Sequence, residues 1–244
     1  ADYPVPGLKE TGFITSDDIL EMREAPESII VLGAGAVAVE LAQFLLRIGV
    51  KVTLLQRSPH ILSKGDEDLA QPVEHQFRQE GMDLFTGTKI LRTEKQQKNS
   101  AVYFQHEGEE KRVCAQVILQ ALGRRPNSDG LDLEAAGIET QQGRINVDAK
   151  MKTNQPHIFA VGDVNGIHEV VHIAILQGEV AGHNAVHPEN ERQVDDRLKS
   201  SVVFTDPAVA SVGLSEKECQ AGNIAYLVAS YPFDDHGKSM CLGE

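Results

Sequence analysis

Hydrophobic residues along the chain occur in short continuous runs, and these alternate with longer segments of helical spacing. The run from Ile29 to Leu32 is followed by glycines, then by an apolar segment to about Ile48, and then by a second run from Lys51 to Leu55. Short β-branched runs are typical of strands buried on both faces, and the segment between them is long enough for a crossover helix. This pattern predicts a β-α-β unit and a parallel sheet.

The pattern changes in the next part of the chain. A helix is predicted over residues 66–81, although Pro72 removes a backbone hydrogen bond if it lies beyond the first turn. After this helix come short strand-like runs with polar turns between them, which predict a β-meander in place of the next crossover helix. These runs cover residues 83–97, 100–108 and 110–116.

Two further segments, "VILQALGRRPNS" and "IFAVGDV", each read as a buried strand that ends at a glycine, and a helix is predicted from Val170 to about Val186. The opening residues 1–26 are rich in Pro, Gly and turn formers, so they predict a connecting segment with one short helix that begins near Ser16. Strands become isolated later in the chain, which predicts a domain boundary near residue 190.

Composition narrows the classes of protein. With 244 residues and 41% hydrophobic content, the chain has enough material for one large domain or two modest ones. The formal charge of −13 argues against a nucleic-acid or anionic-membrane partner, because a negative protein repels phosphate. No run approaches the ~18 apolar residues of a membrane span, and no signal peptide is evident. Three separated cysteines, Cys114, Cys219 and Cys241, favour a reducing compartment, so we expect a cytoplasmic protein.

The strongest chemical signal is a glycine motif between the first predicted strand and its helix. It fits G-x-G-x-x-G/A, in which the first glycine makes a tight turn and the second lets the backbone approach a pyrophosphate. A small residue at the last position lets the helix pack against the sheet, and the helix N-terminus binds phosphates. The motif predicts a dinucleotide site, the alternative being a glycine turn without a ligand. Its residues are Gly33, Ala34, Gly35, Ala36, Val37 and Ala38.

The end of the second strand bears on the choice of dinucleotide. An NAD-binding protein usually carries Asp or Glu there, to hold the ribose 2′-OH, but this chain has Gln56 followed by Arg57. A missing carboxylate next to a guanidinium suits a 2′-phosphate, which Arg can bind with two hydrogen bonds. We therefore expect NADP in preference to NAD. The alternative is that Arg57 is a solvated loop residue.

The stretch "HEVVH", from His168 to His172, matches the H-E-x-x-H signature of zinc peptidases. A metzincin would continue with glycine and histidine at positions where this chain has Ile175 and Gly178. We therefore interpret the match as accidental and predict no metal site.

The order of these motifs resembles a known family. "IIVLGAGAVAVELAQFLLRIG", "ALGRRPN" and "IFAVGDV" followed by "VVHIAILQGEVAGHNA" together resemble the pyridine nucleotide–disulfide oxidoreductases, flavoenzymes that include dihydrolipoamide dehydrogenase, glutathione reductase and mercuric reductase. "GAVAVELAQ" is most similar to the mercuric reductase branch. "FTDPAVASVGLSEKEC" resembles the opening of the family's C-terminal dimerisation domain.

The resemblance implies an α/β fold with three parts after the connecting segment. Residues 27–142 would form a Rossmann-like NAD(P)-binding domain with the β-meander crossover, and residues 143–190 the C-terminal part of an FAD-binding domain. Residues 191–244 would be the truncated start of an α+β dimerisation domain.

The resemblance also assigns roles to residues around the nicotinamide. Glu40, which follows Val39 in the Rossmann helix, would lie beside the nicotinamide and the flavin; without the resemblance it reads as an exposed helical Glu. Ile90 and Gly123 would contact the nicotinamide cofactor through their backbones. Arg124 fits the loop pattern of the family, and the alternative is an ordinary turn residue.

On the flavin side, Gly162 and Asp163 match the second FAD motif, in which the Asp bonds the ribityl chain. The alternative is an N-cap Asp in a turn. The helix N-terminus that follows would lie under the flavin, and His172 stands where His is common in relatives. The residues assigned to this segment are Glu169, Val170, Val171 and His172.

The departures from the family pattern matter as well. The chain lacks the first FAD-binding glycine motif, the redox-active C-x-x-x-x-C and the terminal His-Glu pair. We therefore expect a central and C-terminal fragment that is inactive alone. The parent would be a cytoplasmic homodimer that passes hydride from NAD(P)H to FAD and then electrons to a small-molecule or protein disulfide or to a metal ion. The alternative is a non-catalytic NAD(P)-binding module.

Overall fold

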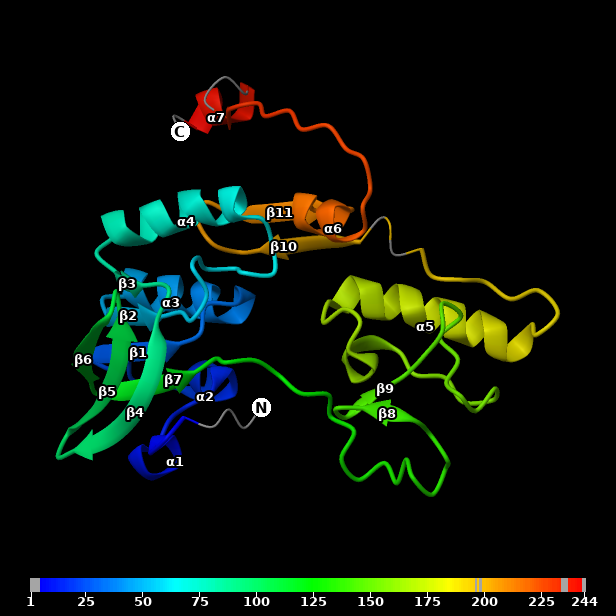
Figure 1. Ribbon diagram of the computed structural model, residues 1–244, viewed down its shortest axis with the longest axis horizontal. Helices are drawn as coiled ribbons and strands as arrows, with labels where there is room; N and C mark the ends of the chain where they lie inside the picture. The colour runs from blue at the N-terminus through cyan, green and yellow to red at the C-terminus, as the bar shows by residue number, and fades with distance from the viewer. Residues whose placement is uncertain (1–4, 196, 198, 234–236, 243–244) are drawn as a thin grey trace. The chain divides into compact units, whose positions relative to one another are not determined.

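The computed structural model describes residues 5–195, 197, 199–233 and 237–242 (Figure 1). The chain divides into two compact units, Ala1–Gly213 and Leu214–Glu244. None of the described helices is long and apolar enough to cross a membrane.

The first unit is built on a four-stranded parallel sheet with the strand order β3-β2-β1-β7. In register, Val31 of the central strand lies opposite Leu54 on one side and Leu119 on the other. The predicted parallel sheet is therefore confirmed. Its strands are β1 (Ser28–Leu32), β2 (Lys51–Leu55), β3 (Asp83–Phe85) and β7 (Val117–Gln120).

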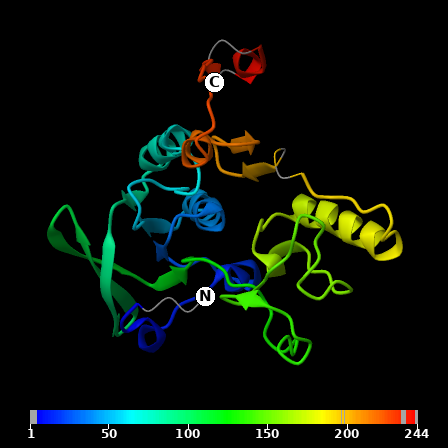
Figure 2. The same cartoon turned by 45° about the vertical axis from the view of Figure 1, so that its right-hand side comes forward.

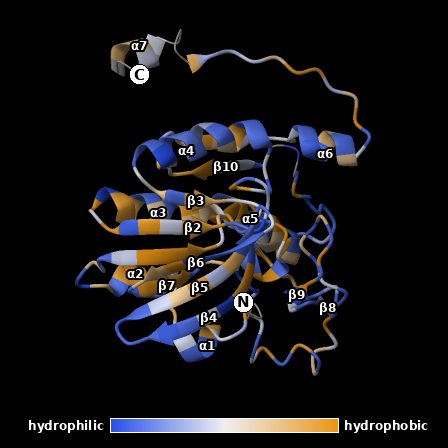
Figure 3. Ribbon diagram, turned by 60° about the vertical axis from the view of Figure 1, so that its left-hand side comes forward, coloured by the Kyte–Doolittle hydropathy of each residue, from blue (hydrophilic) through white to orange (hydrophobic). Residues whose placement is uncertain are grey.

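Both faces of this sheet are covered, which explains why its strands are continuously apolar. Ile29 and Val31 pack in one core cluster with residues of α3 (Ala36–Arg47) and α4 (Glu67–Gln79). Ile30 and Leu32 point to the other face and pack with residues of the meander. All four side chains are fully buried, and hydrophobic residues line the strands in Figure 3.

The meander is an antiparallel sheet in the order β4-β5-β6. The strands of the meander are drawn in green in Figure 2, and they lie away from helices α3 (blue) and α4 (cyan). Its presence between β3 and β7 confirms the predicted crossover, with one correction: the first predicted run splits, and β3 pairs with β2 in the parallel sheet. The strands are β4 (Lys89–Gln96), β5 (Asn99–His106) and β6 (Glu109–Ala115).

Two helices differ in detail from the prediction. The opening segment holds two short helices, α1 (Leu8–Thr11) and α2 (Ser16–Glu21), where one was predicted. Helix α4 continues through Pro72, which lies beyond its first turn. The amphipathic face of α4, with Ala70, Val73 and Phe77 buried, stabilises the helix against the lost hydrogen bond.

The segment after β7 contains little regular structure before α5 (Val171–Val186). The strand predicted for "IFAVGDV" is wrong: Phe159 makes only an isolated bridge to Lys152, and Gly162–Asn165 form a 3₁₀ turn, η1. A strand needs partners for its backbone groups along its whole length, and the described backbone pairing reaches only 158–160, through the Thr153 N–H to Ile158 O and the Ala160 N–H to Met151 O. The remaining elements of the first unit are β8 (Thr140–Gln141), β9 (Arg144–Ile145), β10 (Ser200–Val203) and β11 (Val209–Val212).

The second unit includes the short helices α6 (Glu216–Ala221) and α7 (Gly237–Leu242). Ser215 begins α6 with a capping box: its hydroxyl accepts the Glu218 N–H, and the Glu218 carboxylate accepts the Ser215 N–H.

Candidate functional site

The glycine motif lies where β1 ends and α3 begins, and Gly33 has a conformation that requires glycine. Its φ is +99°, and a methyl group at its Cα would lie 2.5 Å from the carbonyl oxygen of Ala121. The Gly33 N–H donates to Leu55 O at 2.9 Å, so the turn is fixed between neighbouring strands of the sheet. A side chain at position 33 would push these strands apart.

Gly35 is needed for a different reason. It is the N-cap of α3, with φ −75° and ψ 177°, and no side chain caps the helix. A methyl group at Gly35 would have no heavy atom within 4 Å, so the space in front of the helix is open. The first N–H groups of a helix lack internal partners and carry partial positive charge. This geometry fits the pyrophosphate of a dinucleotide.

The rest of the motif packs or faces outward. Ala38 is 1% exposed and Val39 is fully buried, so the small residue at position 38 lets α3 approach the sheet, as predicted. Ala36 and Val37 are exposed on the first turn of the helix, whereas Ala34 is buried in the glycine turn.

The loop after β2 holds the two residues that bear on the choice of nucleotide. Gln56 is buried, and its carboxamide bonds its own loop: Oε1 accepts the Arg57 N–H at 3.1 Å, and Nε2 reaches His60 O at 3.5 Å. Arg57 is exposed, and its side chain has no ion-pair partner among the residues the structure describes. A guanidinium in solvent with no carboxylate beside it is compatible with a bound phosphate.

This loop is fixed by contacts that sequence reasoning missed. The Leu62 N–H donates to Ala34 O at 2.8 Å, which joins the loop to the glycine turn. The Ile61 N–H donates to Glu74 Oε1 of α4 at 2.9 Å. Both groups of Thr88, the N–H and the hydroxyl, donate to Gln56 O. No local pattern signals these contacts, because each joins segments that the chain separates.

The residues assigned to the nicotinamide end lie on different elements. Glu40 is half-buried on α3, and its Oε1 accepts the Phe204 N–H at 2.8 Å. Ile90 packs on the meander side of the sheet, at a bulge in β4. Gly123, with φ +130°, follows β7. The structure thus brings Glu40 to the loop after β10, and it leaves Ile90 partly buried against the core cluster on the meander side of the sheet.

The turn at Gly162 and Asp163 is supported by a buried amide that sequence reasoning also missed. Gln177 of α5 is 1% exposed, and its Oε1 accepts the Gly162 N–H at 2.7 Å and the Asn165 Nδ2 at 2.8 Å. Gly162 has φ +72°. The sequence does not single out Gln177, because α5 also contains the polar residues His172, Glu179, His183 and Asn184.

Asp163 itself points to solvent, and the nearest cation is Arg124. The Arg124 Nη2 lies 3.9 Å from the Asp163 Oδ2, and the two side chains are 68% and 52% exposed. A pair this long and exposed contributes little stability. The Asp163 carboxylate oxygens can therefore accept hydrogen bonds from the hydroxyl groups of a ligand.

The histidines of "HEVVH" do not share a helix. Helix α5 begins at Val171 with Val170 as an N-cap that lacks a side-chain bond, so His168 and Glu169 precede it. His172 is exposed, and its Nε2 lies 3.0 Å from Ser200 O. The zinc-peptidase geometry needs both imidazoles on one helix face. Among the residues the structure describes, no group of three or more His, Cys, Asp or Glu could hold a metal.

Comparison with known proteins decides the family. Residues 1–178 match the pyridine nucleotide-disulphide oxidoreductase family, and residues 199–244 match the dimerisation domain of the same family. The chain belongs to the pyridine nucleotide-disulphide oxidoreductases. The resemblance seen in the sequence is thereby confirmed, and so is a mixed α/β fold with a parallel sheet and a dimerisation domain.

Individual relatives within this family are similar over nearly the whole chain. A dihydrolipoyl dehydrogenase from Mycobacterium leprae is 34% identical over 242 residues, which is 98% of this chain and 52% of the relative. A mercuric reductase from Staphylococcus aureus is 31% identical over 231 residues, 94% of this chain and 42% of the relative. The chain thus spans about half the length of these relatives.

Solved structures share the fold. The Cu(II) complex of RclA, an HOCl-induced flavoprotein disulfide reductase from Escherichia coli, has a TM-score of 0.86 at 26% identity, and the match covers 100% of this chain and 55% of that one. LpdA from Mycobacterium tuberculosis has a TM-score of 0.84 at 26% identity, covering 94% of this chain and 50% of the other.

Proposed function

We propose that the chain is the NAD(P)-binding part, with adjoining flavin-side and interface segments, of a cytoplasmic, homodimeric, flavin-dependent oxidoreductase. The complete enzyme would pass hydride from NAD(P)H to FAD and then electrons to a disulfide-type or metal-ion acceptor. The observation that carries the proposal is the uncapped N-terminus of α3 behind Gly33 and Gly35, which has the backbone geometry of a pyrophosphate site.

Within this proposal, the dinucleotide lies across the glycine turn with its adenosine end toward Arg57 and its nicotinamide end toward Glu40. The backbones of Ile90 and Gly123 contact it in the complete enzyme. We propose NADP as the preferred nucleotide, because the chain has no carboxylate at position 56 to repel the 2′-phosphate and Arg57 is exposed nearby.

The flavin side rests on the turn before α5. Gly162 and Asp163 with Arg124 nearby would hold the FAD, and the N-terminus of α5 from Glu169 to His172 would lie under it. The exposed Asp163 carboxylate suits ribityl hydroxyls, and Gln177 fixes the turn that presents it. FAD, when bound, supplies a two-electron acceptor for the hydride.

The domain limits follow from the same assignment. We propose a connecting segment at residues 1–26, the NAD(P)-binding domain at 27–142, the flavin-side part at 143–190 and the interface segment from 191 onward.

A second candidate is a nucleotide-binding module without catalysis. It needs only the glycine turn and the uncapped start of α3, and the three cysteines of the sequence include no C-x-x-x-x-C pair. A single thiol cannot store two electrons as an intramolecular disulfide.

The test is a calorimetric titration of the chain with NADPH and with NADH, followed by FAD with an absorbance readout. Binding of both a dinucleotide and a flavin supports the oxidoreductase proposal. A full-length protein that binds a dinucleotide but purifies without a yellow flavin chromophore favours the module, and binding of neither dinucleotide to the chain at millimolar concentration contradicts both candidates.

A further inference from the structure

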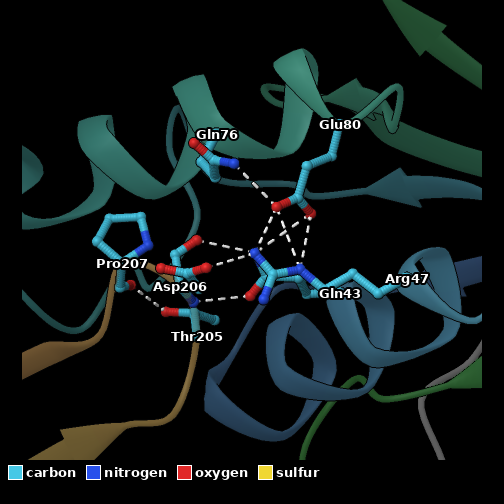
Figure 4. Close-up of polar contacts among 7 residues, drawn as sticks. All are labelled: Gln43, Arg47, Gln76, Glu80, Thr205, Asp206 and Pro207. Atoms are coloured by element: carbon cyan, nitrogen blue, oxygen red, sulfur yellow. Dashed lines mark hydrogen bonds and ion pairs between the residues drawn. The ribbon is translucent and has the colours of Figure 1, made fainter. Parts of the chain in front are cut away.

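One face of α3 holds a loop from a distant part of the chain. Glu40, Gln43 and Arg47 are spaced i, i+3 and i+7, so they lie along one side of the helix. All three contact the residues that follow β10, and Figure 4 shows the contacts that Gln43 and Arg47 make with Asp206. We call Phe204–Pro207 the docking loop; it joins β10 to β11.

Gln43 makes the most specific contact. Its side chain is 4% exposed, its Nε2 donates to Asp206 O at 2.8 Å, and its Oε1 accepts the Asp206 N–H at 2.8 Å. The carboxamide thus pairs with both backbone groups of one residue. Because these two bonds require a single orientation of the amide, they fix the position of the docking loop along α3.

Arg47 adds an electrostatic contact at the same residue. Its guanidinium lies between two carboxylates, with Nη2 2.5 Å from Glu80 Oε1 and 2.6 Å from Asp206 Oδ2 (Figure 4). Glu80 is held in place by the Gln76 amide of α4 at 2.9 Å. The nearby guanidinium holds the pKa of the Glu80 carboxyl below its usual value. The charge network therefore joins α3, α4 and the docking loop.

The docking loop is braced on both sides of Asp206. The Thr205 hydroxyl donates to Pro207 O at 2.8 Å, and Thr205 is 6% exposed. Val203 and Val209, just outside the loop, pack against the core cluster on the helix side of the sheet. With the loop fixed, the Phe204 N–H is presented to Glu40 Oε1 at 2.8 Å.

We infer that Gln43, Arg47 and Glu80 are positioning residues for the nicotinamide end of the dinucleotide. They fix Asp206, so that the Phe204 N–H two residues earlier holds the Glu40 carboxylate in one rotamer on α3. Without that bond, the half-buried Glu40 side chain would have several rotamers. Its carboxylate would then lose the fixed orientation in which it accepts a hydrogen bond from the carboxamide group of the nicotinamide. The inference rests on the proposed function, because it takes Glu40 as a nicotinamide contact.

The test compares two ligands that differ only in the nicotinamide. NADPH and 2′-phospho-ADP-ribose are titrated by calorimetry against the wild-type chain, Gln43→Ala and Asp206→Ala. Gln43→Ala removes both amide bonds, whereas Asp206→Ala removes the ion pair from the loop side and leaves α3 unaltered. Gln79→Ala is the matched control, because Gln79 is an exposed glutamine on α4 that bonds only His75 of its own helix among the described contacts.

We expect Gln43→Ala to weaken NADPH by about three- to tenfold while 2′-phospho-ADP-ribose changes by less than about twofold. Asp206→Ala should lower the affinity for NADPH relative to that for 2′-phospho-ADP-ribose by a smaller factor. Gln79→Ala should leave this ratio of affinities at the wild-type value. A purely structural role would weaken both ligands equally, since a disturbed α3 would lose the pyrophosphate as well.

Equal losses for the two ligands, or no loss in either docking variant, would overturn the inference while leaving the proposed function intact. If the wild-type chain binds neither ligand, nor the corresponding pair NADH and ADP-ribose, the proposed function fails and the inference fails with it.

Discussion

Replacing Gly33 by alanine should damage the fold, whereas the same replacement at Gly35 should damage only nucleotide binding. The two glycines are two residues apart in the same turn, but their surroundings differ. At Gly33 φ is +99°, and the added methyl would meet the Ala121 carbonyl oxygen at 2.5 Å. At Gly35 φ is −75°, and nothing lies within 4 Å of the added methyl.

The cost at Gly33 has two parts. Placing an L-residue at positive φ costs roughly 1–2 kcal/mol, and a contact with a backbone oxygen at this distance adds about 1–3 kcal/mol because neither strand can move freely. We expect Gly33→Ala to lower the free energy of unfolding by about 2–5 kcal/mol. Gly35→Ala should change it by less than about 1 kcal/mol, since alanine adopts the observed φ and ψ without strain and is only a poorer N-cap.

The assay is urea unfolding followed by circular dichroism, which suits a chain without tryptophan. The same proteins are then titrated with NADPH by calorimetry. Gly35→Ala should unfold near the wild-type midpoint and yet bind NADPH at least about tenfold more weakly, because the methyl occupies space that the pyrophosphate needs.

Two results would refute this reasoning. If Gly33→Ala were as stable as wild type, Gly33 would not have the conformation and close contact that the turn assigns to it. If Gly35→Ala bound NADPH with wild-type affinity, the phosphates would lie elsewhere, and the uncapped end of α3 would not be the nucleotide site.

Further predictions concern other parts of the chain. Arg57→Ala should weaken NADP by about three- to tenfold and leave NAD unchanged in parallel titrations, because an exposed guanidinium is partly screened; equal losses would place Arg57 away from the 2′-phosphate. Gln177→Leu should cost about 2–3 kcal/mol in urea unfolding by leaving buried donors unpaired, and a neutral result would mean that water replaces the amide. The Glu80 carboxyl has a lowered pKa in the folded state, so its contribution to stability is present above its unfolded value of 4.5 and is lost as pH falls through the folded value. The destabilisation caused by Arg47→Met should therefore be larger at about pH 7 than at about pH 3, and a pH-independent difference would contradict the assignment. The 244-residue chain by itself should show no NADPH-dependent disulfide reduction, and steady turnover in a thiol assay would contradict this.

The sequence determined the central unit because its pattern is local. Ile29–Leu32 is apolar at every position, and only a strand buried on both faces needs that. The glycine spacing and the small Ala38 specified the turn and the helix packing before any contact was known. For the same reason the meander was predictable from its polar turns.

Prediction failed where a segment depends on a distant partner. "IFAVGDV" has the composition of a strand, but a strand also needs neighbouring backbone, and only Lys152 bridges to Phe159. Similarly, the run that begins at Asp83 gave no sign that β3 would leave the meander for the parallel sheet. Composition carries strand propensity, but not the identity of the partner strand.

The contacts that fix the candidate site were decided by tertiary structure alone. Gln43 and Asp206 are 163 residues apart, and neither residue type nor spacing marks them as partners. Gln177 likewise supports Gly162 only because α5 lies against the turn. The sequence thus specified which backbone turn could receive a dinucleotide, since that depends on residues a few positions apart. The side chains that fix the segments around this turn were decided by packing across the whole unit. A hydrogen bond between remote segments forms only once the core has brought them together.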